Sequence, residues 1–170
     1  MRWFRLLDEA YLETSFTGEG ARLFGGRWNS PGVSMVYAAQ SLSLAQLELL
    51  VHLEAEDVLR GHWRYIELEV VPEAVLACEL VAELPADYAA WPAPASTRSI
   101  GDAWAASGVS VGLTVPSAVT PGERNLILNP AHPGFAAAVE IGEPRFGSTA
   151  RLPPVRDLHL SQTGAEKRPQ

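Results

Sequence analysis

The sequence has few of the features that staple small proteins or anchor them in membranes. Its 170 residues include one cysteine, Cys78, which excludes a disulfide framework and a cysteine-based zinc cage. Cys78 lies in an apolar stretch, and we expect it to be a small core residue. No run approaches the roughly 18 apolar residues needed to span a bilayer, and the start is unlike a signal peptide. We therefore expect a cytoplasmic protein without a membrane segment.

Cations are also scarce. The chain has 13 Lys and Arg residues against 20 Asp and Glu, a net charge of −7, and we expect no direct binding to nucleic acid. A small anionic ligand is compatible with this charge, because a single arginine fork can bind a phosphate. Only Lys167 is a lysine. The excess of arginine fits genomic base composition or a set of anion-binding side chains.

The length and the 47% hydrophobic content predict one globular domain. Hydrophobic patterns predict strands at 3–7, 34–39, 62–71, 109–115 and 125–128. We predict one helix from a capping box at Ser43 and Gln46, with Leu42 and Leu47 as its hydrophobic staple, to about Glu54. A second helix is predicted from Ser96 or Thr97 to Ser107, ended by Gly108. Without regular alternation of strands and helices, the order favours an α+β fold.

Two segments are predicted to be irregular. The glycine-rich stretch 17–33 is expected to be a long loop suited to closing over a dinucleotide, since such loops are usually functional or disordered. The stretch 85–96 is rich in proline and alanine and is expected to be a surface connection. The string Gly25-Gly26-Arg27-Trp28-Asn29 lies inside the first of these. It fits a ligand site, in which the glycines let the backbone approach the ligand closely and the arginine offers a planar fork for pyrophosphate or carboxylate. It also fits a plain turn with a solvated arginine.

Glu48 and Ser117 are the other candidates for chemistry. On the first helix Glu48 has mainly apolar neighbours one turn away, so it is either a functional carboxylate or a helix-edge residue that reaches solvent. Ser117 follows a strand without a nucleophile elbow, so a binding or structural hydroxyl is expected rather than a nucleophile. The histidines lack metal-ligand spacing, and we expect no metal site. His132 is expected to bond locally within a turn.

Together these segments resemble the RES-domain toxins. The resemblance rests on residues 25–32, 36–52, 113–117 and 125–135. The family is named after an arginine, a glutamate and a serine, which fall on Arg27, Glu48 and Ser117. Tyr37 matches the active-site tyrosine of the family, and Asn125 or Asn129 is expected to complete the pocket.

The resemblance implies an ADP-ribosyltransferase-like fold, with a mixed sheet at its core and flanking helices. Residues 1–150 would form the RES domain and 151–170 a partly flexible tail. The family implies a bacterial toxin restrained by an Xre-type helix-turn-helix antitoxin. Its implied substrate is NAD⁺, with neither a metal nor another cofactor required.

The implied reaction suits the matching residues. Breaking the nicotinamide–ribose bond passes through an oxocarbenium-like state, which Glu48 could stabilise. Arg27 could bind the pyrophosphate, Tyr37 could stack on the nicotinamide or ribose, and Trp28, Ser117 and Asn125 are expected to contact substrate. We expect NAD⁺ hydrolysis or phosphorolysis. The alternatives are ADP-ribosylation of a cellular protein and an inactive nucleotide- or antitoxin-binding module; a homo-oligomer is left open.

Overall fold

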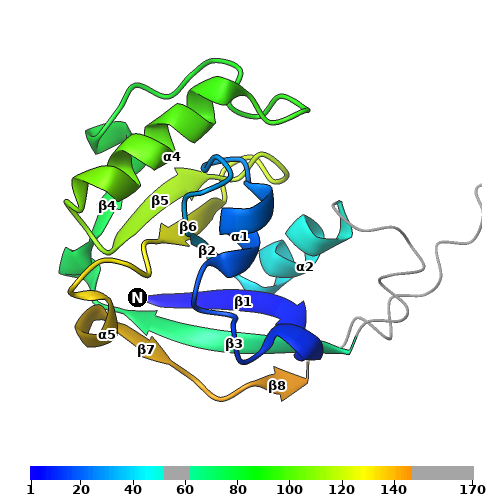
Figure 1. Ribbon diagram of the computed structural model, residues 1–170. Helices are drawn as coiled ribbons and strands as arrows, with labels where there is room; N and C mark the ends of the chain where they lie inside the picture. Colours follow the sequence, from blue (N-terminus) through cyan, green and yellow to red (C-terminus); the bar gives the residue numbers. More distant parts are fainter. Residues whose placement is uncertain (52–61, 147–170) are drawn as a thin grey trace, which may run out of the picture.

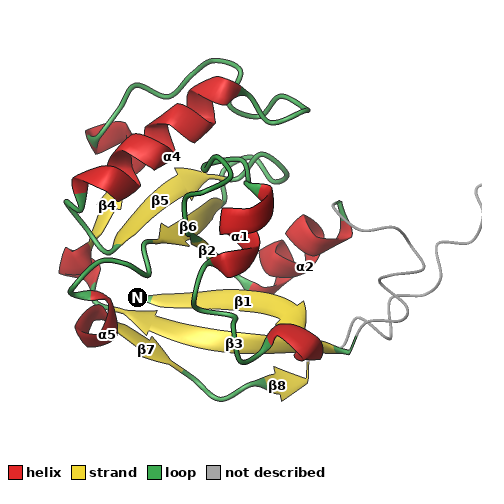
Figure 2. Ribbon diagram, in the orientation of Figure 1, coloured by secondary structure: helices red, strands yellow, loops and turns green. Residues whose placement is uncertain are grey.

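The computed structural model describes residues 1–51 and 62–146. In this part of the chain a curved eight-stranded sheet forms the centre of the molecule, with helices packed around it (Figures 1 and 2). The strands are β1 (Arg2–Asp8), β2 (Val36–Ala39), β3 (Trp63–Val70), β4 (Val75–Ala77), β5 (Gly112–Pro116), β6 (Arg124–Leu128), β7 (Val139–Ile141) and β8 (Arg145–Phe146). The α-helices are α1 (Glu19–Phe24), α2 (Leu42–Leu50), α4 (Ala95–Ser107) and α5 (Phe135–Ala138). Short 3₁₀ turns cover Glu9–Tyr11, Pro72–Ala74 and Cys78–Leu80.

The sheet is mixed, and little strand pairing joins its two halves, which meet between β1 and β2. The strand order is β4-β5-β6-β2-β1-β3-β7, and β8 also pairs with β3. The pair β4–β5 is parallel, and the other pairs are antiparallel. β1 pairs with β3 along its whole length, whereas β1 and β2 share only the register pair Phe4–Ala39. The sheet therefore opens between β1 and β2.

Both faces of the sheet are covered at β6, where successive residues point to opposite sides. In β6, Leu126 and Leu128 belong to a core cluster with residues of β1, β3 and α5. Ile127 points the other way, into a second cluster beneath α4 that also contains Cys78 and Trp104. The predicted burial of Cys78 is confirmed by its 2% exposure.

The helix α2 packs against β1 and β2 beside the opening in the sheet (Figure 1). Leu44 and Ala45 are buried there against Ala39. The predicted capping box is wrong: the N-cap is Ser41, whose hydroxyl accepts a hydrogen bond from the Leu44 N–H at 3.1 Å. The predicted staple is also wrong, since Leu47 is 44% exposed. The helix ends at Leu50, and the predicted end near Glu54 lies outside the described residues.

Two further expectations need correction. The stretch 17–33 is not structureless, because α1 occupies its middle and Gly32 N–H bonds back to the Arg22 carbonyl at 2.7 Å. The strand β4 was not predicted; it adds the parallel edge beside β5. The predicted end of the second helix is confirmed, since α4 ends where Gly108 adopts a left-handed conformation with φ of 58°. The predicted cap at Ser96 or Thr97 is wrong, because the N-cap is Pro94 and both residues lie inside the helix. No helix among the described residues is long and apolar enough to cross a membrane.

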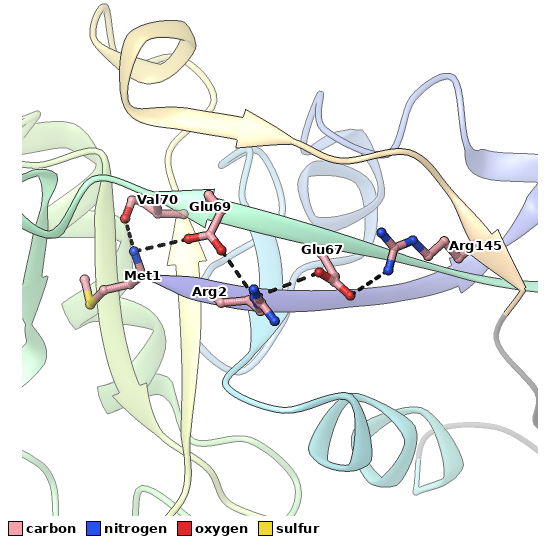
Figure 3. A network of polar contacts seen from close by, with 6 residues as sticks. All are labelled: Met1, Arg2, Glu67, Glu69, Val70 and Arg145. Atoms are coloured by element: carbon pink, nitrogen blue, oxygen red, sulfur yellow. Dashed lines mark hydrogen bonds and ion pairs between the residues drawn. The ribbon is translucent and has the colours of Figure 1, made fainter.

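A ladder of polar contacts crosses β1, β3 and β8 at a distance from the opening in the sheet (Figure 3). The Met1 ammonium donates to the Val70 carbonyl at 2.6 Å, and Arg2 Nε donates to Glu69 at 3.2 Å. Arg145 reaches Glu67 from β8 at 3.0 Å. Because these side chains are largely solvated, the ladder adds little to stability. Its effect is to make this surface of the sheet polar.

Candidate active site

A cavity of about 490 Å³ opens where the two halves of the sheet separate. This volume lies in the range typical of small-molecule sites. A smaller recess of about 160 Å³, between α2 and the ends of β1 and β2, adjoins it. Both spaces are lined by Arg5, Tyr37, Glu48 and Asn125. Of these two spaces, only the larger is lined by the sequence candidates Arg27 and Trp28.

Glu48 reaches this cavity because of its place on α2. It lies one turn after Leu44 and Ala45, on the face that packs against the sheet. Its Oε1 accepts hydrogen bonds from the Ser117 hydroxyl at 2.9 Å and from the Asn125 amide at 2.6 Å. A carboxylate so held is a preorganised negative charge at the wall of the cavity.

Ser117 and Asn125 come from neighbouring strands. Ser117 follows β5 directly, and Asn125 lies in β6 opposite Ala39 and Val115. The Ser117 hydroxyl donates to Glu48 and also accepts from the N–H groups of Val119 and Thr120, both at 3.0 Å. Ser117 is 2% exposed. Its hydroxyl therefore orients the carboxylate.

Arg27 is held at the wall of the cavity by backbone carbonyls. Its Nη1 donates to the carbonyls of Tyr88 and Ala90 at 2.7 and 2.9 Å. A guanidinium carries five N–H donors, so within the described residues these bonds leave further donors for an anion. The predicted surface connection 85–96 thus has a function in the site, because its carbonyls orient Arg27.

The loop of Arg27 is clamped by one face of α4. The Thr97 hydroxyl donates to the Arg27 carbonyl at 2.7 Å, and the Ser30 N–H donates to Asp102 at 2.9 Å. Between these bonds, Gly101 approaches so closely that a Cβ built there would lie 1.8 Å from the Trp28 carbonyl oxygen. Glycine is required for this contact because any side chain would overlap the loop backbone.

Tyr37 and Trp28 both line the cavity, and each is also tied into the surrounding protein. The Tyr37 ring borders the cavity, while its hydroxyl donates to Asn29 Oδ1 at 2.7 Å and accepts from the Trp28 N–H at 3.1 Å. Burial raises the pKa of Tyr37, so the phenol stays neutral near pH 7. The Trp28 residue is 2% exposed and packs in the cluster beneath α4. Trp28 thus belongs both to this core cluster and to the lining of the larger cavity.

Arg5 is a site residue that sequence reasoning missed. Its Nη1 donates to the Tyr37 carbonyl at 2.6 Å, and its guanidinium lies 6.0 Å from the centre of the Phe16 ring. Its Nε is buried and has no hydrogen-bond partner among the described residues. Burial lowers the pKa of Arg5 to about 10. One signal was present in the sequence: an arginine at a central position of an otherwise apolar strand.

The remaining candidates lie outside this cavity. Asn129 is buried, but its amide donates to the Ala105 carbonyl at 3.0 Å and its Oδ1 accepts from Ala131. Asn125 is therefore the asparagine that lines the cavity. His132 bonds locally as expected, with Nδ1 accepting from the Gly134 N–H at 3.0 Å. The described residues contain no group of three His, Cys, Asp or Glu side chains placed to hold a metal ion.

The chain is similar to known toxins in sequence and to a solved structure in fold. It is 37% identical over 144 residues to Toxin Res of Yersinia enterocolitica, covering 85% of this chain and 93% of that protein. It is 44% identical over 136 residues to the Prs ADP-ribosylating toxin of a Sphingobium species, covering 77% and 83%. It superimposes with a TM-score of 0.64 on a chain of the M. tuberculosis MbcT–MbcA toxin–antitoxin complex, at 23% identity and 88% and 85% coverage.

The structural likeness agrees with the predicted class, an α+β, ADP-ribosyltransferase-like fold around a mixed sheet. Residues 2–153 match the RES domain. Since this match spans most of the sequence and the relatives share more than a third of their residues with it, the chain belongs to the RES domain family.

Proposed function

We propose that this protein is the toxin of a bacterial toxin–antitoxin module and that it consumes NAD⁺ by cleaving the nicotinamide–ribose bond. The observation that carries the proposal is the Glu48 carboxylate, held by Ser117 and Asn125 at the wall of a cavity that also contains two arginines. This arrangement offers one negative charge and two positive ones to a single ligand. NAD⁺ needs the same combination, because its ribose becomes cationic as the bond breaks while its pyrophosphate stays anionic.

The reaction then assigns a task to each side chain. The bond between the ribose carbon and the nicotinamide nitrogen breaks, and its electron pair leaves with neutral nicotinamide. Glu48 stabilises the positive charge that develops on the ribose ring. Water or phosphate attacks the ribose carbon and loses a proton, which gives ADP-ribose or its phosphate ester. Arg27 and Arg5 bind the pyrophosphate, and Tyr37 offers its ring to the substrate.

A second candidate function is transfer of ADP-ribose to a cellular protein. The specific observation in its favour is the 44% identity to a protein named for ADP-ribosylating Prs. Cleavage would follow the same path, but a side chain of the target protein would attack the ribose carbon. Such a reaction also needs a surface that docks the target and positions its nucleophile.

One experiment separates these functions. The purified chain is incubated with NAD⁺, with and without phosphate and with and without cell extract, and the products are identified by mass. Free nicotinamide at many turnovers without extract supports NAD⁺ degradation, and the phosphate arm identifies the acceptor. Label transfer to one protein band that depends on extract, with negligible turnover alone, supports the transferase. If the parent and the Arg27→Ala variant give the same traces in every arm, the site is not an NAD⁺ site.

The expected partner is an Xre-type antitoxin with a helix-turn-helix domain. Its support is the toxin–antitoxin complex that contains the structural neighbour and the net charge of −7 of this chain, which disfavours direct binding to DNA. Co-expression of such an antitoxin should rescue growth and yield a stable complex. Tight operator binding by the toxin alone would contradict this division of labour.

A further inference from the structure

The side chain of Asn29 is the most extensively bonded polar group near the cavity. Asn29 is 0% exposed. The two N–H groups of its Nδ2 are shared among the carbonyls of Ala21, Val33 and Ser30 at 2.8, 2.9 and 3.1 Å, while its Oδ1 accepts from the Tyr37 hydroxyl at 2.7 Å. One side chain thus connects α1, residues 30 and 33 of the following loop and the strand β2. A buried amide satisfied in this way holds its surroundings in one arrangement.

The same loop closes on the Tyr37 hydroxyl from the other side. The Trp28 N–H donates to this hydroxyl at 3.1 Å, and the Gly26 N–H donates to the Asn29 carbonyl at 2.9 Å. A Cβ at Gly26 would lie 2.6 Å from the hydroxyl oxygen and 2.8 Å from Asn29 Oδ1. Gly26 therefore lacks a side chain because the Tyr37 hydroxyl and the Asn29 amide fill its place.

These contacts use the hydrogen-bonding capacity of the Tyr37 hydroxyl within the protein. Its proton is donated to Asn29, and its oxygen accepts from Trp28. The loop that it fixes includes Arg27, whose carbonyl is held independently by Thr97. Tyr37 also lines the cavity, and the part of its side chain that these bonds leave uncommitted is the ring.

We infer that Asn29 is a positioning residue that fixes the Arg27 loop through the Tyr37 hydroxyl, and that this hydroxyl serves the loop rather than the substrate. Tyr37 then acts on a ligand through its ring alone. The part of the inference that concerns substrate rests on the proposed function. The part that concerns the loop does not, and it is tested separately.

Kinetics test the substrate part with Tyr37→Phe, which keeps the ring and removes only the hydroxyl. An interaction that holds a binding loop contributes equally to the bound substrate and the transition state, so its loss raises KM and leaves kcat unchanged. We expect KM for NAD⁺ to rise on the order of tenfold, as for one lost hydrogen bond, with kcat within about twofold. Tyr37→Leu should lower kcat as well. A Tyr37→Phe variant with parental KM and a greatly reduced kcat would overturn the inference.

A double-mutant cycle tests whether Asn29 and Tyr37 act through one bond. If they do, Tyr37→Phe adds little to the KM of Asn29→Ala, because the interaction is already lost. The matched control is Asn129→Ala, since Asn129 is also a buried asparagine but bonds to Ala105 away from the cavity. This control should lower stability without a change in KM. Additive effects of the two site variants, or an equal KM rise in the control, would overturn the inference.

Hydrogen exchange tests the loop part without any substrate. In Tyr37→Phe the amides of Gly26 and Trp28 should exchange about tenfold faster than in the parent, while those of Leu126 and Leu128 in β6 keep their rates. Unchanged protection of residues 26–29 would overturn the inference even if the parent consumes NAD⁺. If the parent does not consume NAD⁺, the proposed function fails, and the exchange rates still decide whether Asn29 and Tyr37 hold the loop.

Discussion

The Ser117 hydroxyl donates to the Glu48 carboxylate at 2.9 Å, although 69 residues separate them in the chain. The serine follows β5, and the glutamate lies on α2. The same hydroxyl accepts two backbone N–H groups, so its rotation is fixed by the turn that follows β5. The position of the proposed catalytic charge thus depends on a turn on the other side of the sheet opening.

Removing this hydroxyl should reduce turnover without removing the carboxylate. In Ser117→Ala, Glu48 loses a hydrogen-bond donor to its Oε1 and gains freedom to rotate, so the charge is less well placed for the ribose. We expect kcat to fall about tenfold to a hundredfold and KM to change little, measured by nicotinamide release. The control is Ser43→Ala, an exposed serine of the same helix as Glu48. Parental kcat in Ser117→Ala would show that Asn125 alone suffices to orient Glu48.

The charge itself is tested by Glu48→Gln. Glutamine keeps an oxygen that can accept from Ser117 and Asn125, so the variant removes the negative charge and little else. Loss of one electrostatic group of this kind costs about 10²–10³ in kcat, and we expect a loss of that size together with relief of toxicity. Glu140→Gln on the exposed edge of β7 should remain active and toxic. Near-parental turnover in Glu48→Gln would assign the stabilising charge elsewhere.

Features that depend on residues close together in the sequence were predicted, whereas features that depend on contacts between distant segments were not. The strands β3 and β6 and the helix α4 follow from local hydrophobic patterns and a C-terminal glycine, and their predicted bounds are close to those observed. The cap of α2 was misassigned because Ser41 and Ser43 both suit an N-cap. The choice between them depends on where the chain leaves β2, and a local pattern does not contain that information.

The site residues divide in the same way. Arg27 and Glu48 were identifiable from their unusual surroundings in the sequence, and both line the cavity. Trp28 lines the same cavity, but its packing in the core beneath α4 was not predicted, because an aromatic residue in a glycine-rich string fits a ligand contact as well as a core position. Arg5 was missed because the function of a buried arginine depends on the strand beside it. β1 and β2 share only one register pair at that point.

Arg5 gives a prediction that separates binding from folding. Arg5→Met keeps much of the apolar stem and removes the buried charge, so we expect the variant to fold. It should lose affinity for ADP-ribose about tenfold or more, measured by calorimetry, because one fork facing the pyrophosphate is lost. Arg2→Met, on the exposed end of the same strand, should bind as the parent does. Undiminished binding by Arg5→Met would show that its Nε does not meet the ligand.

The pair Glu79–Arg124 predicts a pH dependence of stability. The Arg124 fork donates to both Glu79 oxygens at 2.9 and 2.8 Å and lowers the pKa of this carboxyl to about 2. A carboxyl with a lowered pKa stabilises the fold above its ordinary pKa of 4.5, and this contribution is lost as the pH falls toward 2. Because both side chains are partly exposed, we expect about 1 kcal/mol or less.

The measurement is the free energy of unfolding of the parent and of Glu79→Gln between pH 7 and pH 2. The parent should be the more stable protein at pH 6, and the two curves should converge below pH 4.5. Other carboxyl groups lower both curves alike and cancel in the difference. A gap that stays constant down to pH 2 would show that the ion pair contributes nothing through its charge.

The contact between Gly101 and Trp28 makes the strongest prediction about the scaffold of the site. A Cβ at position 101 would lie 1.8 Å from the Trp28 carbonyl oxygen, so in Gly101→Ala either α4 or the Arg27 loop must move. Overpacking against backbone costs about 3 kcal/mol, and the displaced loop carries Arg27 with it. We expect a lower melting temperature together with a rise in KM for NAD⁺. The control is Gly20→Ala in α1, where a Cβ meets nothing within 4 Å and helix propensity favours alanine by up to about 1 kcal/mol. If Gly101→Ala were as stable as Gly20→Ala and kept the parental KM, α4 would not be the element that holds the Arg27 loop in place.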